Sequence, residues 1–178
     1  MKAIGLTGTL ATMTLALISS AAAERAVNQH GSACAPVYGN NTTYPYNTGL
    51  NGIAWTGTTQ TYFHCPAPAP VESDANGIAT SNVKLLKMYV EDGSTTQTFR
   101  CQGILYAQDG SGFTATSQKY ACSVAGGCVD STTAFSGETT FEWPINWVTS
   151  GSWVMFQCLT PGKNPTSSYI SSYRVVYQ

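Results

Sequence analysis

The stretch Ser81–Cys122 reads S-N-V-K-L-L-K-M-Y-V-E-D-G-S-T-T-Q-T-F-R-C-Q-G-I-L-Y-A-Q-D-G-S-G-F-T-A-T-S-Q-K-Y-A-C. Two Asp-Gly-Ser triplets, at 92–94 and 109–111, divide it into three runs of strand length. Asp-Gly is typical of tight hairpin turns because glycine accepts the positive φ that these turns require. The alternation of the middle run places Phe99, Cys101 and Leu105 on one face of a strand. The stretch therefore predicts an up-down-up meander at the centre of an antiparallel sheet.

The first of the three runs, 83–90, also fits a helix. Val83, Leu86 and Val90 follow helical spacing, and the lysines and leucines of this run are good helix formers. The turn signals on either side and the strand-like neighbouring runs favour a strand. We therefore expect a strand here, with a helix as the alternative.

The rest of the chain shows the same pattern of short apolar runs separated by Gly, Pro, Ser and Asn. Such runs, without a convincing helix, are typical of two packed antiparallel sheets. The sequence therefore predicts an all-β fold, an antiparallel β-sandwich of Greek-key or jelly-roll type that disulfides staple together. The further expected strands cover residues 52–56, 59–65, 132–135, 139–143, 152–158 and 169–177.

The first 23 residues have the pattern of a secretory signal peptide. Lys2 provides a positive start, residues 3–18 are mostly apolar, and Ser19–Ala23 offers a small-residue cleavage site. The apolar part is too short and too rich in Thr and Gly to favour a membrane span. We expect cleavage near Ala23, a flexible or edge-pairing N-terminus over 24–33, and one β-sandwich domain over 34–178. The expected location is extracellular or periplasmic.

Six cysteines, an even number, predict three disulfides formed in an oxidising compartment. A four-residue hairpin loop, Gly110–Phe113, would place Cys101 directly opposite Cys122, so we predict a Cys101–Cys122 disulfide. The competing interpretation is a local Cys122–Cys128 link. The remaining predicted pairs are Cys34–Cys65 and Cys128–Cys158.

Several short motifs resemble a group of uncharacterised bacterial exported proteins. These motifs are Ala33-Cys34-Ala-Pro36 near the expected mature start, an aromatic-rich strand end with Cys65-Pro66, and Ser172-Tyr-Arg-Val175 near the C-terminus. The resemblance spans most of the expected mature chain, and Cys128 is additional to the pattern. It implies an exported β-rich fold and brings no assigned activity.

The charge content narrows the classes of partner. Charged residues make up 10% of the chain, against about 25% in ordinary soluble domains. The formal net charge is −1. Proteins that bind nucleic acids or anionic membranes usually show a basic patch, which this composition does not supply. Ser, Thr, Asn, Gln and Tyr are expected to cover the surface instead.

Residue patterns for catalysis or metal binding are weak. His64 is the only histidine well inside the domain, and its place before Cys65 at a strand end is typical of a structural histidine. Glu138 and Glu142 could share one strand face, but about 13 Å along the strand exceeds the separation that a glycosidase pair needs. There is no Gly-x-Ser-x-Gly elbow and no Cys-x2-Cys pair. We therefore expect no metal and no cofactor.

Aromatic residues offer the more suggestive pattern, with four tryptophans and ten tyrosines on a weakly charged chain. Trp153 lies in the most apolar run and is expected in the core. We expect Pro144 to break its strand and turn Trp147 outward, beside the hydrogen-bonding side chain of Asn146. Tyr44 and Tyr46, in a Pro-containing loop, are the next candidates for ligand contact.

These patterns favour a secreted, non-catalytic binding or structural module that contacts a polysaccharide or cell-surface glycan through exposed aromatics. A secreted hydrolase is one alternative. A self-assembling cell-surface or matrix subunit is the other, with self-association through the N-terminal segment or the strand at 169–177.

Overall fold

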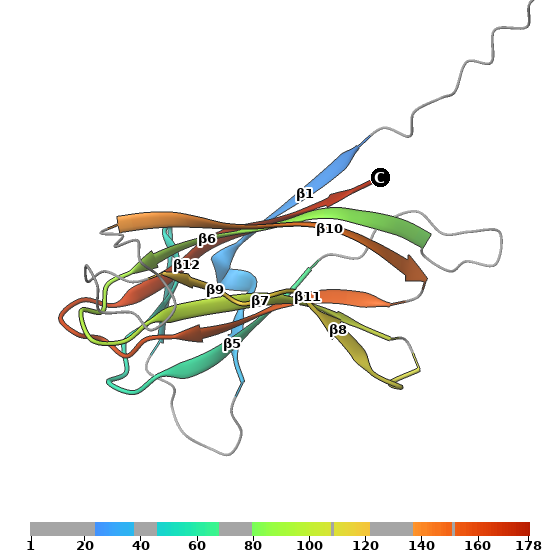
Figure 1. Cartoon of the computed structure of the whole chain (residues 1–178). Helices are drawn as coiled ribbons and strands as arrows, with labels where there is room; N and C mark the ends of the chain where they lie inside the picture. The colour runs from blue at the N-terminus through green and yellow to red at the C-terminus, as the bar shows by residue number, and fades with distance from the viewer. Residues whose placement is uncertain (1–23, 38–45, 68–79, 108, 122–136, 151) are drawn as a thin grey trace, which may run out of the picture.

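The computed structural model describes residues 24–37, 46–67, 80–107, 109–121, 137–150 and 152–178. Within these ranges the chain forms twelve β-strands and one short 3-10 turn, η1 (Gly31–Ala33), and no α-helix. The strands form two antiparallel sheets that lie over one another as two layers (Figure 1). The fold is therefore the disulfide-stapled antiparallel β-sandwich that the sequence predicts.

The upper layer in Figure 1, sheet A, has the strand order β10-β6-β12-β4-β3. The first half of β12 pairs with β4, and its second half pairs with β1. Apart from the β3–β4 hairpin, neighbouring strands of sheet A are not consecutive in the sequence, as in Greek-key folds. The strands of sheet A are β1 (Arg25–His30), β3 (Tyr46–Gly49), β4 (Gly52–Trp55), β6 (Thr80–Asp92), β10 (Gly137–Ser150) and β12 (Ser168–Tyr177).

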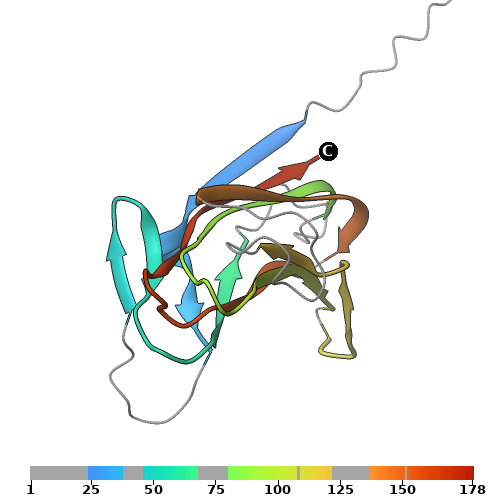
Figure 2. The same ribbon diagram turned by 60° about the vertical axis from the view of Figure 1, so that its left-hand side comes forward.

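The lower layer, sheet B, has the order β2-β5-β11-β7-β8, and β9 also pairs with β7. Figure 2 shows β3 and β4 (cyan) at one side of the sandwich and β8 (dark yellow) at the other. The strands of sheet B are β2 (Ala35–Pro36), β5 (Thr61–Pro66), β7 (Phe99–Tyr106), β8 (Phe113–Ala115), β9 (Lys119–Ala121) and β11 (Trp153–Thr160).

The first Asp-Gly-Ser triplet connects the two sheets and is not a hairpin turn. The strand interpretation of residues 83–90 is confirmed, but β6 lies in sheet A and β7 in sheet B, so the predicted three-stranded meander is wrong. Asp92 is buried at the crossing, where its Oδ1 accepts hydrogen bonds from the Ser94 amide and the Ser168 hydroxyl. Gly93 is needed for close approach, because a Cβ there would lie 2.5 Å from the Ser167 carbonyl oxygen.

The second Asp-Gly-Ser triplet does form the predicted hairpin turn, between β7 and β8. Gly110 has a φ of 71°, and the Asp109 carboxylate accepts a hydrogen bond from the Ser111 amide. The Ala107 amide donates to the Gly112 carbonyl, and the Gly110 amide donates back to the Ala107 carbonyl, so that the turn is closed. The same three residue types therefore serve two different connections, and only the tertiary structure distinguishes them.

Strand β10 continues through Pro144, so the predicted strand break is wrong. β10 lies at the edge of sheet A, where a proline is tolerated because its missing N–H can face away from the neighbouring strand. The pairing register shifts between Pro144 and Trp147, so that two residues of β10 oppose Lys84 alone. This β-bulge accommodates the extra residue, and the strand continues beyond Pro144.

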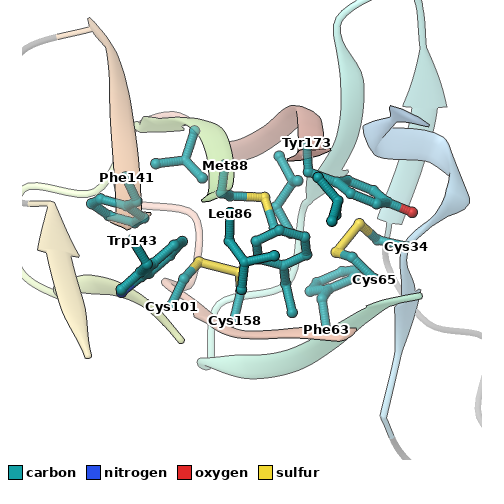
Figure 3. Packing of buried hydrophobic residues seen from close by; sticks show 14 of the residues in the cluster. Cys34, Phe63, Cys65, Leu86, Met88, Cys101, Phe141, Trp143, Cys158 and Tyr173 are labelled. Carbon is teal, nitrogen blue, oxygen red and sulfur yellow. A yellow bond between two sulfur atoms is a disulfide. The ribbon is translucent and has the colours of Figure 1, made fainter. Parts of the chain in front are cut away.

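The hydrophobic core lies between the sheets, where the inward side chains of both layers meet (Figure 3). The rings of Phe156 in sheet B and Tyr173 in sheet A have centroids 5.3 Å apart. The Tyr173 hydroxyl donates a hydrogen bond to the Pro66 carbonyl, 2.7 Å away, and so joins the two sheets. Burial raises the pKa of Tyr173 to about 12, because the phenolate would be poorly solvated there.

Two disulfides lie within this core, and both belong to sheet B or the residue that leads into it (Figure 3). Cys101 of β7 pairs with Cys158 of β11, with Cα atoms 4.1 Å apart. Cys34, directly before β2, pairs with Cys65 of β5, with Cα atoms 4.0 Å apart. The Cys34–Cys65 prediction is confirmed.

The predictions of Cys101–Cys122 and Cys128–Cys158 disulfides are wrong, because Cys101 and Cys158 pair with each other. The hairpin closes at the Ala107–Gly112 hydrogen bond, earlier than predicted, and the pairing of β7 with β9, shifted by one residue from that with β8, places Cys101 opposite Lys119. The alternative Cys122–Cys128 link and the strand expected at 132–135 lie outside the described residues. The N-terminal stretch expected to be flexible or edge-pairing forms β1 on β12 over residues 25–30.

Candidate functional site

An exposed row of three aromatic side chains crosses the outer face of sheet B. Trp153 of β11 stands opposite Tyr106 of β7, which in turn stands opposite Phe113 of β8. The Trp153 and Tyr106 ring centroids are 5.8 Å apart with planes 22° from parallel, and those of Tyr106 and Phe113 are 5.9 Å apart. Trp153 is 51% and Phe113 65% exposed, and Tyr106 is half-buried. We call these three residues the aromatic row.

Strand alternation directs Trp153 away from the core. Val154, Phe156 and Cys158 of β11 point inward and are buried in the core cluster. Trp153 lies on the opposite face, since successive side chains of a strand point to opposite sides of the sheet. The sequence-based expectation that Trp153 is a core residue is therefore wrong.

A polar row runs parallel to the aromatic row, four residues further along β11. The amide nitrogen of Gln102 donates to Oε1 of Gln157, 3.0 Å away, and the amide nitrogen of Gln157 lies 3.1 Å from Nε2 of His64. Because an amide nitrogen only donates, Nε2 of His64 is the acceptor and carries no proton. Burial lowers the pKa of His64, which also favours the neutral ring. We call His64, Gln157 and Gln102 the polar row.

An apolar band separates the two rows. Met155 stands opposite Ile104, and Ile104 stands opposite Ala115 on the other side of β7. Met155 and Ile104 are buried although their strand positions face away from the core. The outer face of sheet B thus presents stacked rings at one end, an apolar middle and hydrogen-bonding amides beyond it.

The structure places the predicted residues Trp147 and Asn146 differently from the expectation. Trp147 is half-buried and packs against the core cluster, opposite the fully buried Val83. It also lines a groove of about 270 Å³ between β10 and the β8–β9 side of sheet B. Asn146 is exposed, and its Oδ1 accepts a hydrogen bond from Nζ of Lys84, 2.7 Å away. The expected outward turn of Trp147 is therefore wrong.

Tyr46 is 41% exposed and lies on β3, where it faces Trp55 of β4. Strand β3 and strand β10 are at opposite ends of sheet A, so the fold does not bring Tyr46 close to Trp147 or Asn146. Tyr44 lies outside the described residues. The predicted binding residues therefore do not form one site.

The residues considered for hydrolysis do not converge. Glu142 forms an ion pair with Lys87, with 2.5 Å between Oε1 and Nζ, and is half-exposed. Nε2 of His64 is bonded to an amide, where a triad would need a hydroxyl. Within the described ranges, no three His, Cys, Asp or Glu side chains gather as metal ligands, and no helix has the length and apolarity to cross a membrane.

Comparisons with known proteins add no relative, since no protein-family model, no curated protein and no solved structure matches this chain. Sequence reasoning missed the aromatic row because its members come from three separate runs. A usable signal was present: Tyr106 and Phe113 flank the Asp-Gly hairpin turn, and a pair flanking such a turn faces the same side of the sheet.

Proposed function

We propose that the protein is a non-catalytic binding module that contacts glycans through the aromatic row on sheet B. One observation carries the proposal: Trp153, Tyr106 and Phe113 lie in register on three adjacent strands, on the face turned away from the core. Contiguous exposed apolar side chains are uncommon on soluble domains and usually mark an interaction surface. Flat rings of this kind offer contact area to the apolar faces of sugars, with little entropy to lose.

The polar row supports a ligand with hydroxyl groups. It lies about 13 Å from the aromatic row, four residues along β11 at about 3.3 Å per residue. The amides of Gln102 and Gln157 hydrogen-bond to each other and keep further capacity to donate and accept. An extended glycan chain could therefore stack on the rings and hydrogen-bond to the amides of the same face.

An extracellular or periplasmic setting supports the same function. The two disulfides are typical of proteins that mature in an oxidising compartment. We propose that residues 1–23 direct export and are cleaved near Ala23, in keeping with the resemblance to bacterial exported proteins. A glycan of a cell surface or matrix would then be within reach of the domain.

The test is a binding assay of the purified protein on insoluble polysaccharides, with cellulose, chitin, xylan and peptidoglycan as the panel. Trp153→Ala is expected to weaken binding about fivefold, because stacking of one ring contributes about 1 kcal/mol. The matched control is Tyr46→Ala, which removes an exposed aromatic from the opposite sheet. Its binding should equal that of the unmodified protein.

The proposal fails if none of the polysaccharides retains the protein, or if Trp153→Ala binds as tightly as the unmodified protein. A self-assembling subunit would behave differently, because Trp153→Ala would then lower the sedimentation coefficient without any glycan present. Sedimentation at several protein concentrations separates that alternative from glycan binding.

A further inference from the structure

A groove of about 340 Å³ lies on the outer face of sheet A, on the opposite side of the sandwich from the aromatic row. It is lined by three cationic side chains, Lys84 and Lys87 of β6 and Arg174 of β12. These are three of the eight Lys and Arg residues in a chain whose net charge is −1. We call this groove, with these three residues, the cationic groove.

Two of these cationic side chains lie close enough to repel each other when no anion is bound. Arg174 stands directly opposite Lys87 in the pairing of β12 with β6. Like charges opposite each other in a sheet repel and destabilise the pairing. The carboxylate of Glu142 offsets part of this repulsion from the Lys87 side, whereas on its other side Arg174 faces the uncharged Asn28 of β1. An anion seated between the two cationic side chains would remove the remaining repulsion.

Among the described residues, the hydrogen bonds of the groove leave one donor of Arg174 without an acceptor. Nζ of Lys87 is paired with the carboxylate of Glu142, and Nζ of Lys84 donates to the amide oxygen of Asn146. Nε of Arg174 is buried and has no hydrogen-bond partner among the described residues. A buried donor without an acceptor is costly, and the rest of the Arg174 side chain is only half-buried, so a small turn of the guanidinium toward an acceptor oxygen in the groove is favoured. Glu24 also lines the groove. The three cationic side chains therefore face two carboxylates, that of Glu24 in the lining and that of Glu142 bound to Lys87.

We propose that the cationic groove binds an oxyanion group, a carboxylate, phosphate or sulfate, with Arg174 as the principal contact. The guanidinium presents its donors in a planar fork that matches two oxygens of such a group, and Lys87 adds charge from the facing strand. Leu85, Pro144 and Val176 line the same groove and provide apolar contact for the carbon skeleton that carries the anion. The site is independent of the glycan contact proposed on sheet B.

The Nε–H resonance of Arg174 reports on this site directly. The chain contains three arginines, Arg25, Arg100 and Arg174, so their Nε–H signals in a nitrogen-15 spectrum can be assigned by single substitution. We expect inorganic phosphate or a galacturonate trimer, added at constant ionic strength, to shift the Arg174 signal to saturation. The Arg100 signal, on sheet B, should stay in place. A tighter response to galacturonate identifies a polymer carboxylate as the ligand, and a tighter response to phosphate identifies a phosphate group.

Substitutions then test the assigned contact, with the backbone amide of Lys87 as the reporter. Arg174→Gln should raise the dissociation constant about tenfold, the loss expected for one charge-assisted hydrogen bond. Arg100→Gln is the matched control and should change nothing. If Arg174→Gln does not fold, Lys87→Gln provides the test and should also weaken binding. The proposal is overturned if neither anion gives a saturable shift, if chloride gives the same shift, or if the substitutions leave the dissociation constant unchanged.

Discussion

Removal of the Cys101–Cys158 disulfide tests the pairing that distinguishes this fold from the sequence-based prediction. The two cysteines are 57 residues apart in the sequence and are joined across the central strands of sheet B. In the chain-entropy account, a closed loop of that length contributes about 4 kcal/mol to the free energy of unfolding. Since small domains are stable by only about 5–15 kcal/mol, the variant should lose a large part of its stability.

The assay is urea unfolding of the double variant Cys101→Ala/Cys158→Ala. For a denaturant slope of about 2 kcal/mol per molar, the loss corresponds to a fall of about 2 M in the unfolding midpoint. The matched control is Cys34→Ala/Cys65→Ala, which opens a loop of 31 residues and should cost slightly less.

Peptide mapping without reduction complements the unfolding experiment. It should return Cys101 linked to Cys158 and Cys34 linked to Cys65, which leaves Cys122 only Cys128 as an intramolecular partner. A map with Cys101 linked to Cys122, or a stability loss below about 1 kcal/mol in the double variant, would refute the pairing and the strand register on which it depends.

Three further outcomes follow from particular side chains. Because burial lowers the pKa of His64 below 6.5, the folded state binds this proton less readily than the unfolded state, so stability should fall as the pH drops below 6.5. Urea unfolding at pH 7.5 and 5.5 should show this loss, and His64→Gln should reduce it. Gly103→Ala should cost about 1–3 kcal/mol, since its new Cβ would overlap Cδ1 of the fully buried Leu86, and Leu86→Val should recover part of the loss in the double variant. Trp147→Ala should lower the melting temperature more than Trp153→Ala, because only the first ring packs against the core; equal melting temperatures would contradict the assignment of the two tryptophans.

Local signals were sufficient for the class of fold. Alternation in 61–65 and 99–103 matches the buried and partly exposed positions of β5 and β7, because each side chain's direction in a strand depends only on its neighbours. Gly110 marks a hairpin turn because its positive φ is a local backbone requirement.

In a nearly continuous apolar run, alternation does not show which side chains point toward the core. Residues 153–159 contain several apolar side chains on both faces, and Met155 and Leu159 are indeed buried on the outer face. Trp153 differs only because it stands at the strand end, beside Tyr106 and Phe113 from another hairpin. Its exposure depends on which strands lie next to it, and the sequence of one strand does not contain that information.

What the sequence by itself determined is the all-β class of the fold, most of the segments that form strands, the even number of cysteines and the weakly charged, aromatic-rich composition. What only the tertiary structure decided is which sheet each strand joins, which cysteines face each other and which tryptophan reaches the surface. The two Asp-Gly-Ser triplets show the physical reason. Their local chemistry is the same, but Asp92 is buried at a crossing between sheets and Asp109 is exposed in a hairpin turn. Contacts with residues more than 70 positions away, such as Ser168, set that difference.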